Sequence, residues 1–270
     1  MSIVFASAAS HAPGATAWPD AAGPEKLAAV TAGFQKIKDG LHASNPDVLL
    51  ALTSEHWANF FLDHVSAFCV GRAPSFSGPV EPWLKVPKQT FPGDPAFALA
   101  LLEHCYANGF EPSHAQELQF DHGTMVPLSF LAPPPQCRIV PIVFNTLAPP
   151  RATPRRCLEL GRTLRTFLEG RPERIAIIAT GGMSHDPGER RHGFIDTEFD
   201  AEFLRRVTQG AMQELGAYSD ADLLAAGAGT LELLAWICLA GLMEGSKADV
   251  LVYEAVKPWA TGIGMVAYDL

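Results

Sequence analysis

Short apolar runs alternate with helical patterns along most of the chain, and this alternation restricts the fold more than any other feature of the sequence. Runs typical of strands include Ile3–Ala9, Asp47–Ser54 and Arg174–Thr180. Between the first two, Pro24–Ser44 repeats its apolar residues at helical spacing. Strands that alternate with helices favour a largely parallel sheet covered on both faces. We therefore expect an α/β fold with a central, mostly parallel or mixed sheet and helices on both faces.

The remaining segments extend this pattern along the rest of the sequence. We expect further strands at Val65–Gly71, Arg138–Asn145, Val250–Glu254 and Gly262–Tyr268, and helices at Ala96–Asn108, Pro154–Leu168, Asp196–Leu215 and Gly229–Glu244. Pro141 predicts that its strand lies at a sheet edge or contains a bulge. The Pro- and Gly-rich stretches 72–95 and 132–135 are typical of long loops, and no compositional break accompanies them. We expect a single domain over residues 1–270.

Composition and charge argue against several classes of protein. The 270 residues are 48% hydrophobic, which suffices for a large core. A formal net charge of −9 argues against a nucleic-acid or anionic-membrane partner, because such binding needs clustered Lys and Arg. No apolar run approaches the roughly 20 residues of a membrane span, and the first residues lack the basic region of a signal peptide. The five cysteines are scattered without a CxxC motif, which is typical of reduced thiols in a cytoplasmic protein.

Three histidines directly follow predicted strands, and a fourth precedes a predicted helix. His11 follows 3–9, His56 follows 47–54 and His185 follows 174–180, whereas His122 stands in the segment DHGT before a helix start. Ligands of parallel α/β sheets bind beyond the carboxyl ends of the strands, so the four side chains should converge on one site. A histidine without such placement is commonly a hydrogen-bonded surface residue. We assign that structural role to His42, His64, His104, His114 and His192.

Glu232 stands between leucines in a predicted helix that is otherwise apolar. If it is buried, its charge requires a cation or a strong hydrogen-bond partner. If it is exposed in the first helical turn, it interacts only with the helix dipole. The segment alone leaves both interpretations open. Two histidines, one carboxylate and open coordination positions form the facial triad of non-heme Fe(II) oxygenases.

The segment IAIIATGGMSHDP, residues 175–187, also allows a different chemistry. Its GMSHD resembles the start of the G-x-S-x-G nucleophile elbow, with Asp186 in place of the last glycine. Ser184 and His185 are adjacent, so their side chains would diverge from a turn. A hydrolase with Ser184 as its nucleophile is therefore the weaker alternative.

Five segments occur in an order that resembles the class III extradiol ring-cleavage dioxygenases. They are Ser10–Pro13, Glu55–Phe61, Asp121–Ser129, Gly181–His185 and Gly229–Glu232. The likeness runs nearly end to end, and it is greatest toward the catalytic β subunit of protocatechuate 4,5-dioxygenase and toward gallate dioxygenases. Each motif alone is weak, but five motifs in order with matching spacing are specific.

The resemblance implies Fe(II) held by His11, His56 and Glu232. It implies that His185 is the acid–base residue near the substrate hydroxyl and that His122 is a second polar group at the site. The expected substrate is a small catechol-like aromatic, with vicinal hydroxyls or an aminophenol or hydroxypyridone arrangement, which O2 cleaves to a semialdehyde-type product. Iron would bring the ring and O2 together, and a histidine can move the phenolic proton because its pKa lies near operating pH.

The sequence departs from the family pattern in two places. Glu55 stands where the family commonly has Asp before the second histidine ligand, and the turn 257–262 lacks the Asn–Thr pair expected of protocatechuate enzymes. The identity of the aromatic substrate therefore stays open. We expect a homo-oligomer, which acts either alone or with a separate small α subunit. A non-catalytic metal-binding or interaction protein on the same scaffold is a further alternative.

Overall fold

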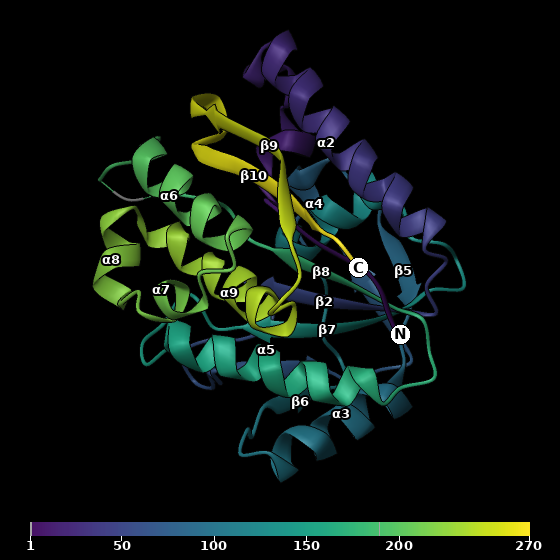
Figure 1. Ribbon diagram of the computed structural model, residues 1–270. Helices are drawn as coiled ribbons and strands as arrows, with labels where there is room; N and C mark the ends of the chain where they lie inside the picture. The colour runs from purple at the N-terminus through teal and green to yellow at the C-terminus, as the bar shows by residue number, and fades with distance from the viewer. Residues whose placement is uncertain (1, 189) are drawn as a thin grey trace.

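An eight-stranded mixed sheet lies at the centre of the computed structural model, which describes residues 2–188 and 190–270 (Figure 1). Its strands are β1 (Ile3–Ala9), β2 (Val48–Ser54), β3 (Phe68–Gly71), β6 (Ser113–Ala115), β7 (Arg138–Phe144), β8 (Ile175–Thr180), β9 (Ala248–Val256) and β10 (Thr261–Tyr268). Their order across the sheet is β6-β3-β7-β2-β8-β1-β10-β9. The central strands β7, β2, β8 and β1 pair in parallel, whereas β3 and β10 run antiparallel to their central neighbours. The predicted α/β class and mixed sheet are confirmed.

Helices cover both faces of this sheet. They are α1 (Gly14–Ala17), α2 (Pro24–Ala43), α3 (Pro95–Ala107), α4 (His122–Leu131), α5 (Pro154–Glu169), α6 (Thr197–Thr208), α7 (Met212–Gly216), α8 (Asp220–Ala225) and α9 (Leu233–Leu242). Figure 1 shows α2 and α5 on opposite sides of the strands. Successive side chains of a strand point to opposite faces. In β2, Leu49 and Ala51 accordingly pack with α2 and α4, whereas Leu50 and Leu52 pack with α5 and α9.

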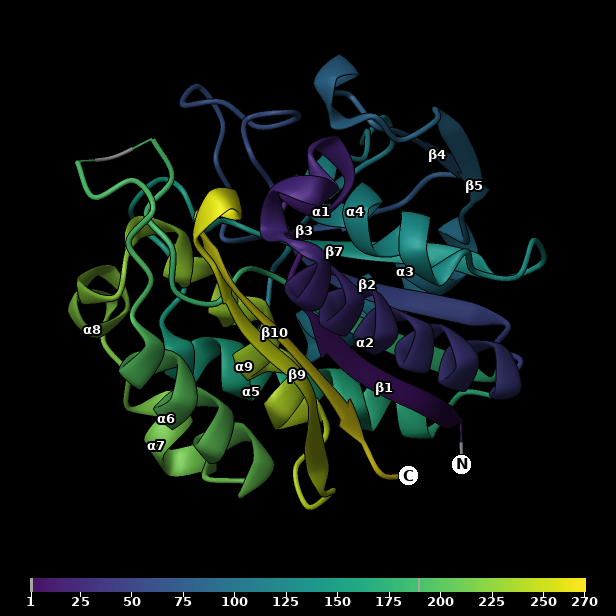
Figure 2. The ribbon, with the colours of Figure 1, turned by 90° about the horizontal axis from the view of Figure 1, so that it is seen from above.

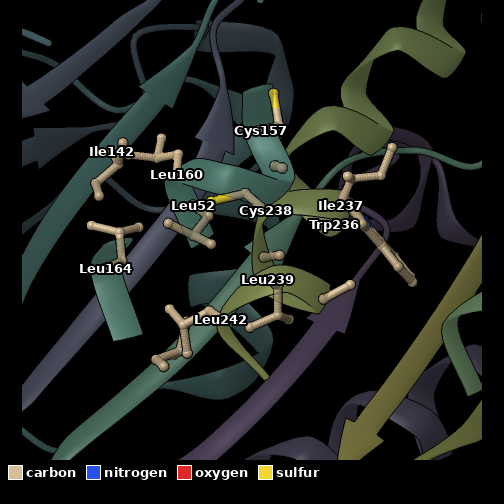
Figure 3. Close-up of a cluster of buried hydrophobic side chains, with 14 of the residues drawn as sticks. Leu52, Ile142, Cys157, Leu160, Leu164, Trp236, Ile237, Cys238, Leu239 and Leu242 are labelled. Carbon is tan, nitrogen blue, oxygen red and sulfur yellow. The ribbon is translucent and has the colours of Figure 1, made fainter. Parts of the chain in front are cut away.

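The layer between α5, α9 and the sheet is closely packed. Figure 3 shows Leu160 and Leu164 of α5 in the same buried cluster as Cys238 and Leu242 of α9. The two helices approach closely enough that a Cβ atom built on Gly161 of α5 would overlap the carbonyl oxygen of Cys238. All ten residues of α9 are buried, which explains the unusually apolar sequence of this segment.

Several elements differ from the expectations. The long helix expected over Asp196–Leu215 is interrupted between α6 and α7, because Gly210 adopts a φ of +64°. The stretch 72–95, expected as a loop, contains the hairpin of β4 (Ser75–Gly78) and β5 (Gln89–Pro92) and the 3-10 helix η2 (Pro82–Leu84). Within residues 2–188 and 190–270, none of the helices combines the length and apolar character that crossing a bilayer requires.

The expectation that Pro141 marks a sheet edge or a bulge is wrong. Strand β7 lies inside the sheet, between β3 and β2, and its register with β2 runs without a shift from Arg138 to Phe144. The pairing with β3 covers only residues 142–144, so Pro141 lies just outside it. A proline is tolerated at this position because the ladder pairing with β3 stops at Ile142, so no bond to β3 needs the missing N–H.

Candidate active site

The four histidines singled out in the sequence lie together at the carboxyl edge of the parallel strands. The ring centroids of His11 and His56 are 5.1 Å apart, and those of His56 and His122 are 4.0 Å apart. Nε2 of His185 lies 3.5 Å from Oε1 of Glu232. Figure 2 shows β1 leading into α1, the short helix that begins just after His11. The predicted convergence of these side chains is confirmed.

The carboxylate of Glu232 lies between the imidazoles of His11 and His56. Its Oε2 is 2.9 Å from Nε2 of His11, and its Oε1 is 3.1 Å from Nε2 of His56. Glu232 is only 4% exposed, since it ends the 3-10 helix η3 (Ala228–Glu232) and leads directly into the buried α9. The two interpretations of Glu232 are thus decided in favour of a buried carboxylate.

The hydrogen bonds around His11 fix which of its ring nitrogens carries the proton. The hydroxyl of Thr180 donates to Oγ1 of Thr53 at 2.9 Å, so the Thr180 oxygen accepts from Nδ1 of His11 at 3.2 Å. In the neutral form, which is the form that binds a metal, Nε2 then has the lone pair. This buried Nε2 makes no hydrogen bond, although the Glu232 carboxylate is adjacent. Two lone-pair atoms that face each other in the interior fit a shared cation.

His56 is oriented in the same manner by Asp121, the N-cap residue of α4. Oδ2 of Asp121 lies 3.0 Å from Nδ1 of His56 and accepts the backbone N–H of His56 at 2.8 Å. Burial alone would lower the pKa of His56, but the carboxylates of Asp121 and Glu232 raise it well above its usual value. Burial would likewise raise the pKa of Asp121, yet His56 above all lowers it to about 2. Asp121 therefore holds His56 with Nε2 directed at Glu232.

Comparison with known proteins identifies the family to which this chain belongs. Residues 6–264 match the family model described as the catalytic LigB subunit of aromatic ring-opening dioxygenase. The chain belongs to this family, the class III extradiol dioxygenases. It is therefore an oxidoreductase that opens an aromatic ring with O2.

Individual relatives agree with this assignment. The chain is 25% identical over 288 residues to a 2,3-dihydroxyphenylpropionate/2,3-dihydroxicinnamic acid 1,2-dioxygenase of Photorhabdus laumondii, a match that covers 87% of this chain and 88% of the relative. It is 31% identical over 166 residues to a gallate dioxygenase of Pseudomonas putida, which covers 57% of this chain and 47% of that enzyme. An uncharacterized protein of Escherichia coli has the same fold, with a TM-score of 0.61 at 16% identity over 98% of this chain and 100% of that one.

In this extradiol dioxygenase, His122 is held by Glu81, a residue that the sequence analysis did not single out. Oε1 of Glu81 lies 2.7 Å from Nδ1 of His122 and accepts its backbone N–H at 3.0 Å. Burial and the neighbouring His56 lower the pKa of His122. Glu81 was missed because it belongs to 72–95, the stretch expected as a loop. Asp121 belongs to the segment DHGT, where its position directly before a helix start is typical of an N-cap residue.

His185 is fixed by the backbone on both of its sides. Its Nδ1 lies 2.8 Å from the carbonyl oxygen of Met183, so this nitrogen donates and Nε2 faces the site. Its main chain forms an isolated bridge with Thr261 at the start of β10. Burial would lower the pKa of His185, but the Glu232 carboxylate raises it overall.

The structure rejects the hydrolase alternative. Ser184 is fully buried, and its hydroxyl donates to Oδ2 of Asp200 at 2.9 Å. The Ser184 hydroxyl oxygen also accepts the backbone N–H of Asp196 at 2.7 Å. Nδ1 of the adjacent His185 is occupied by a carbonyl, so Ser184 has neither a base nor access to a substrate.

Glu55, the departure from the family pattern, organises the loop that follows His56. Its carboxylate accepts the backbone N–H groups of Trp57 at 3.0 Å and Phe60 at 3.2 Å, and also that of Asn59. Because these bonds occupy both of its oxygens, Glu55 shapes the chain beside the site and provides no ligand atom to it.

Proposed function

We propose that this dioxygenase uses Fe(II), bound by His11, His56 and Glu232, to cleave a catechol-like ring beside its vicinal oxygens to a semialdehyde-type product. The observation that supports the proposal most is the buried lone pair of His11 Nε2, which faces the Glu232 carboxylate without a hydrogen bond. Two imidazoles and one carboxylate with open positions are the ligand set of non-heme Fe(II) oxygenases. Iron bound there would supply chelation of the ring oxygens and electron transfer between the ring and O2.

A second ligand set competes with this one. Donor atoms of His11, His56 and His122 all lie within 4.8 Å of one another and could hold a metal ion. We favour Glu232 because its two oxygens lie within 3.1 Å of the other two ligands. Burial would raise the pKa of Glu232, but His11 and His185 hold it well below its usual range, so the carboxylate is charged. A buried charge of this kind needs a cation more than a neutral imidazole does.

Two histidines remain for proton transfer and substrate contact. Nδ1 of His185 donates to the Met183 carbonyl, which leaves Nε2 to accept the phenolic proton and later return it. Nδ1 of His122 is occupied by Glu81, which leaves its Nε2 for a substrate hydroxyl. We propose His185 as the acid–base residue and His122 as a substrate-binding group.

Replacing Glu232 with Ala tests the ligand assignment. We expect Fe(II) affinity to fall by more than ~100-fold, since even changes to groups behind the ligands cost about 10–100-fold, and ring opening to be lost with it. His122→Ala should keep its iron but lose activity. Iron content of anaerobically loaded protein and O2 uptake with catechol measure the two effects separately.

Glu244→Ala is the matched control, because Glu244 pairs with Arg162 on the surface beyond the end of α9. This variant should retain both iron and activity. If His122→Ala loses iron while Glu232→Ala keeps it, the three-histidine set holds the metal and our assignment is wrong.

We propose two further properties of the whole protein, its location and its oligomeric state. All five cysteines are free and buried, which supports a reducing, cytoplasmic location. A homo-oligomer, with or without a small α subunit, stays a prediction that the mass of the native protein in solution checks.

A further inference from the structure

A series of adjacent aromatic rings extends from the histidine cluster to the surface. The ring centroid of Trp83 is 5.9 Å from that of His122 and 6.3 Å from that of Trp18. Both indoles are large and remain 47% and 44% exposed, respectively. The ring centroid of His122 lies in turn 4.0 Å from that of His56. These spacings are typical of aromatic side chains in contact, so Trp83 directly adjoins the site.

The backbone segments that bear Trp83 and Trp18 are held in place by hydrogen bonds and by buried neighbouring residues. Trp83 belongs to η2, whose N-cap residue Glu81 is hydrogen-bonded to His122 and whose last residue, Leu84, is fully buried. The carbonyl oxygen of Trp18 accepts the indole N–H of Trp259 at 3.2 Å, and Trp259 is itself buried. A surface that needs no ordering when a ligand arrives loses little entropy on binding. The pair is therefore suited to hold a flat apolar group.

The charges around the site disfavour an anionic group at the same place. The acidic side chains of the cluster are Glu81, Asp121 and Glu232. Within residues 2–188 and 190–270, no Lys or Arg forms an ion pair with any of the three. On the loop after His185, the guanidinium of Arg191 is already engaged by Asp186 and by two carbonyls of α8 and its C-terminus. Within the cluster itself, a carboxylate on the substrate would thus lie beside acidic groups that have no Lys or Arg partner among the described residues.

We propose that Trp83, supported by Trp18, is a specificity-determining residue that binds an uncharged aromatic substituent of the substrate. The ring to be opened occupies the histidine cluster, and the substituent lies against the exposed indole faces. This inference rests on the proposed function, because it assumes that the reacting ring is held at His11, His56 and Glu232. It names the substrate class as aryl-substituted catechols without a carboxylate.

The test compares four probes: catechol, 3-phenylcatechol, 4-phenylcatechol and 2,3-dihydroxybenzoate. We expect the iron-loaded enzyme to show a higher kcat/KM for at least one phenylcatechol than for catechol or the carboxylated ring. In Trp83→Ala this preference over catechol should fall about tenfold, mainly through KM, and in Trp18→Ala it should fall less. Tyr106→Ala is the control, because Tyr106 is also an exposed aromatic residue, on α3, and forms no ring pair with these side chains.

Binding without turnover gives a second readout. Under anaerobic conditions, the preferred phenylcatechol should quench tryptophan fluorescence in the native enzyme, and Trp83→Ala should lose most of this quenching. The subsite is refuted if Trp83→Ala keeps the substrate preference, if the carboxylated ring is the better substrate, or if the variant changes only the oligomeric mass. An enzyme that opens none of the four rings refutes the proposed function itself, which separates the two failures.

Discussion

At the scale of single residues, Gly229 determines where the His185 ring can lie. Its backbone N–H donates to the His185 carbonyl oxygen at 3.0 Å. A Cβ atom at this position would overlap Nε2, Cε1 and Cδ2 of the same imidazole. Glycine is thus required because the main chain of η3 passes directly against the face of the proposed acid–base residue.

Gly229→Ala should therefore displace His185 while the proposed metal ligands stay in place. We expect kcat to fall by about 100-fold or more, since a positioned proton-transfer group contributes about 10²–10⁴-fold. Iron content should remain near that of the native protein. Gly216→Ala is the matched control, because its added methyl group would meet Leu158 only at an ordinary 3.5 Å. Native kcat in Gly229→Ala would remove His185 from the mechanism.

The positions of the proposed ligand residues could be predicted from the sequence, whereas the residue that orients His122 could not. His11 and His56 directly follow apolar strands, and this placement identifies the edge of the sheet to which they belong. Glu81 lies 41 positions before His122, in a stretch without periodicity, so nothing local relates the two. Hydrogen-bond partners that are distant in sequence depend on how loops cross, and loop geometry is not encoded in a short pattern.

At the scale of elements, α5 and α9 meet through backbone contact at Gly161. Because the carbonyl of Cys238 occupies the space of a side chain, any larger residue must push the helices apart. The surrounding leucines seen in Figure 3 are buried and close-packed, so the layer cannot relax easily.

Gly161→Ala should accordingly destabilise the protein by about 1–3 kcal/mol, the usual cost of overpacking a core. Denaturant unfolding monitored by circular dichroism measures this loss. Gly170→Ala at the C-cap of α5 serves as the control, since its new methyl group would lie 3.7 Å from the nearest atom outside its chain neighbours. Equal stability of the two variants would show that the helices adjust without cost.

Strongly periodic or wholly apolar elements were predictable, and short or interrupted ones were not. The buried α9 was expected from its composition, but the 3-10 turn that places Glu232 at its start was not. The β4–β5 hairpin has only four residues in each strand, too few for a clear alternation of side chains. The break at Gly210 was missed because one glycine within a periodic segment is compatible with a continuous helix.

At the scale of the whole molecule, every cysteine is sequestered in the core. Burial raises the pKa of Cys105 to about 11 and that of Cys137 to about 12. Burial also raises the pKa of Cys157 and Cys238. Only the thiolate reacts with disulfide reagents, so both access and ionisation are suppressed in the folded protein.

Ellman's reagent at pH 8 should therefore find no fast-reacting thiol in the native protein. After unfolding in guanidinium chloride, all five cysteines should react. Absorbance at the start of the reaction gives the number of accessible thiols. A thiol that reacts at once without denaturant would reveal a local opening that the packed core does not permit.

The sheet topology also sets an order on biosynthesis. Strand β1 lies between β8 and β10, and the first of these begins only at Ile175. On the ribosome, the earliest strand therefore emerges unpaired and must wait for both of its neighbours. The same delay applies to His11 and His56, which cannot meet Glu232 until α9 is being made. Metal binding by these three proposed ligands therefore cannot precede the synthesis of η3, which carries Glu232.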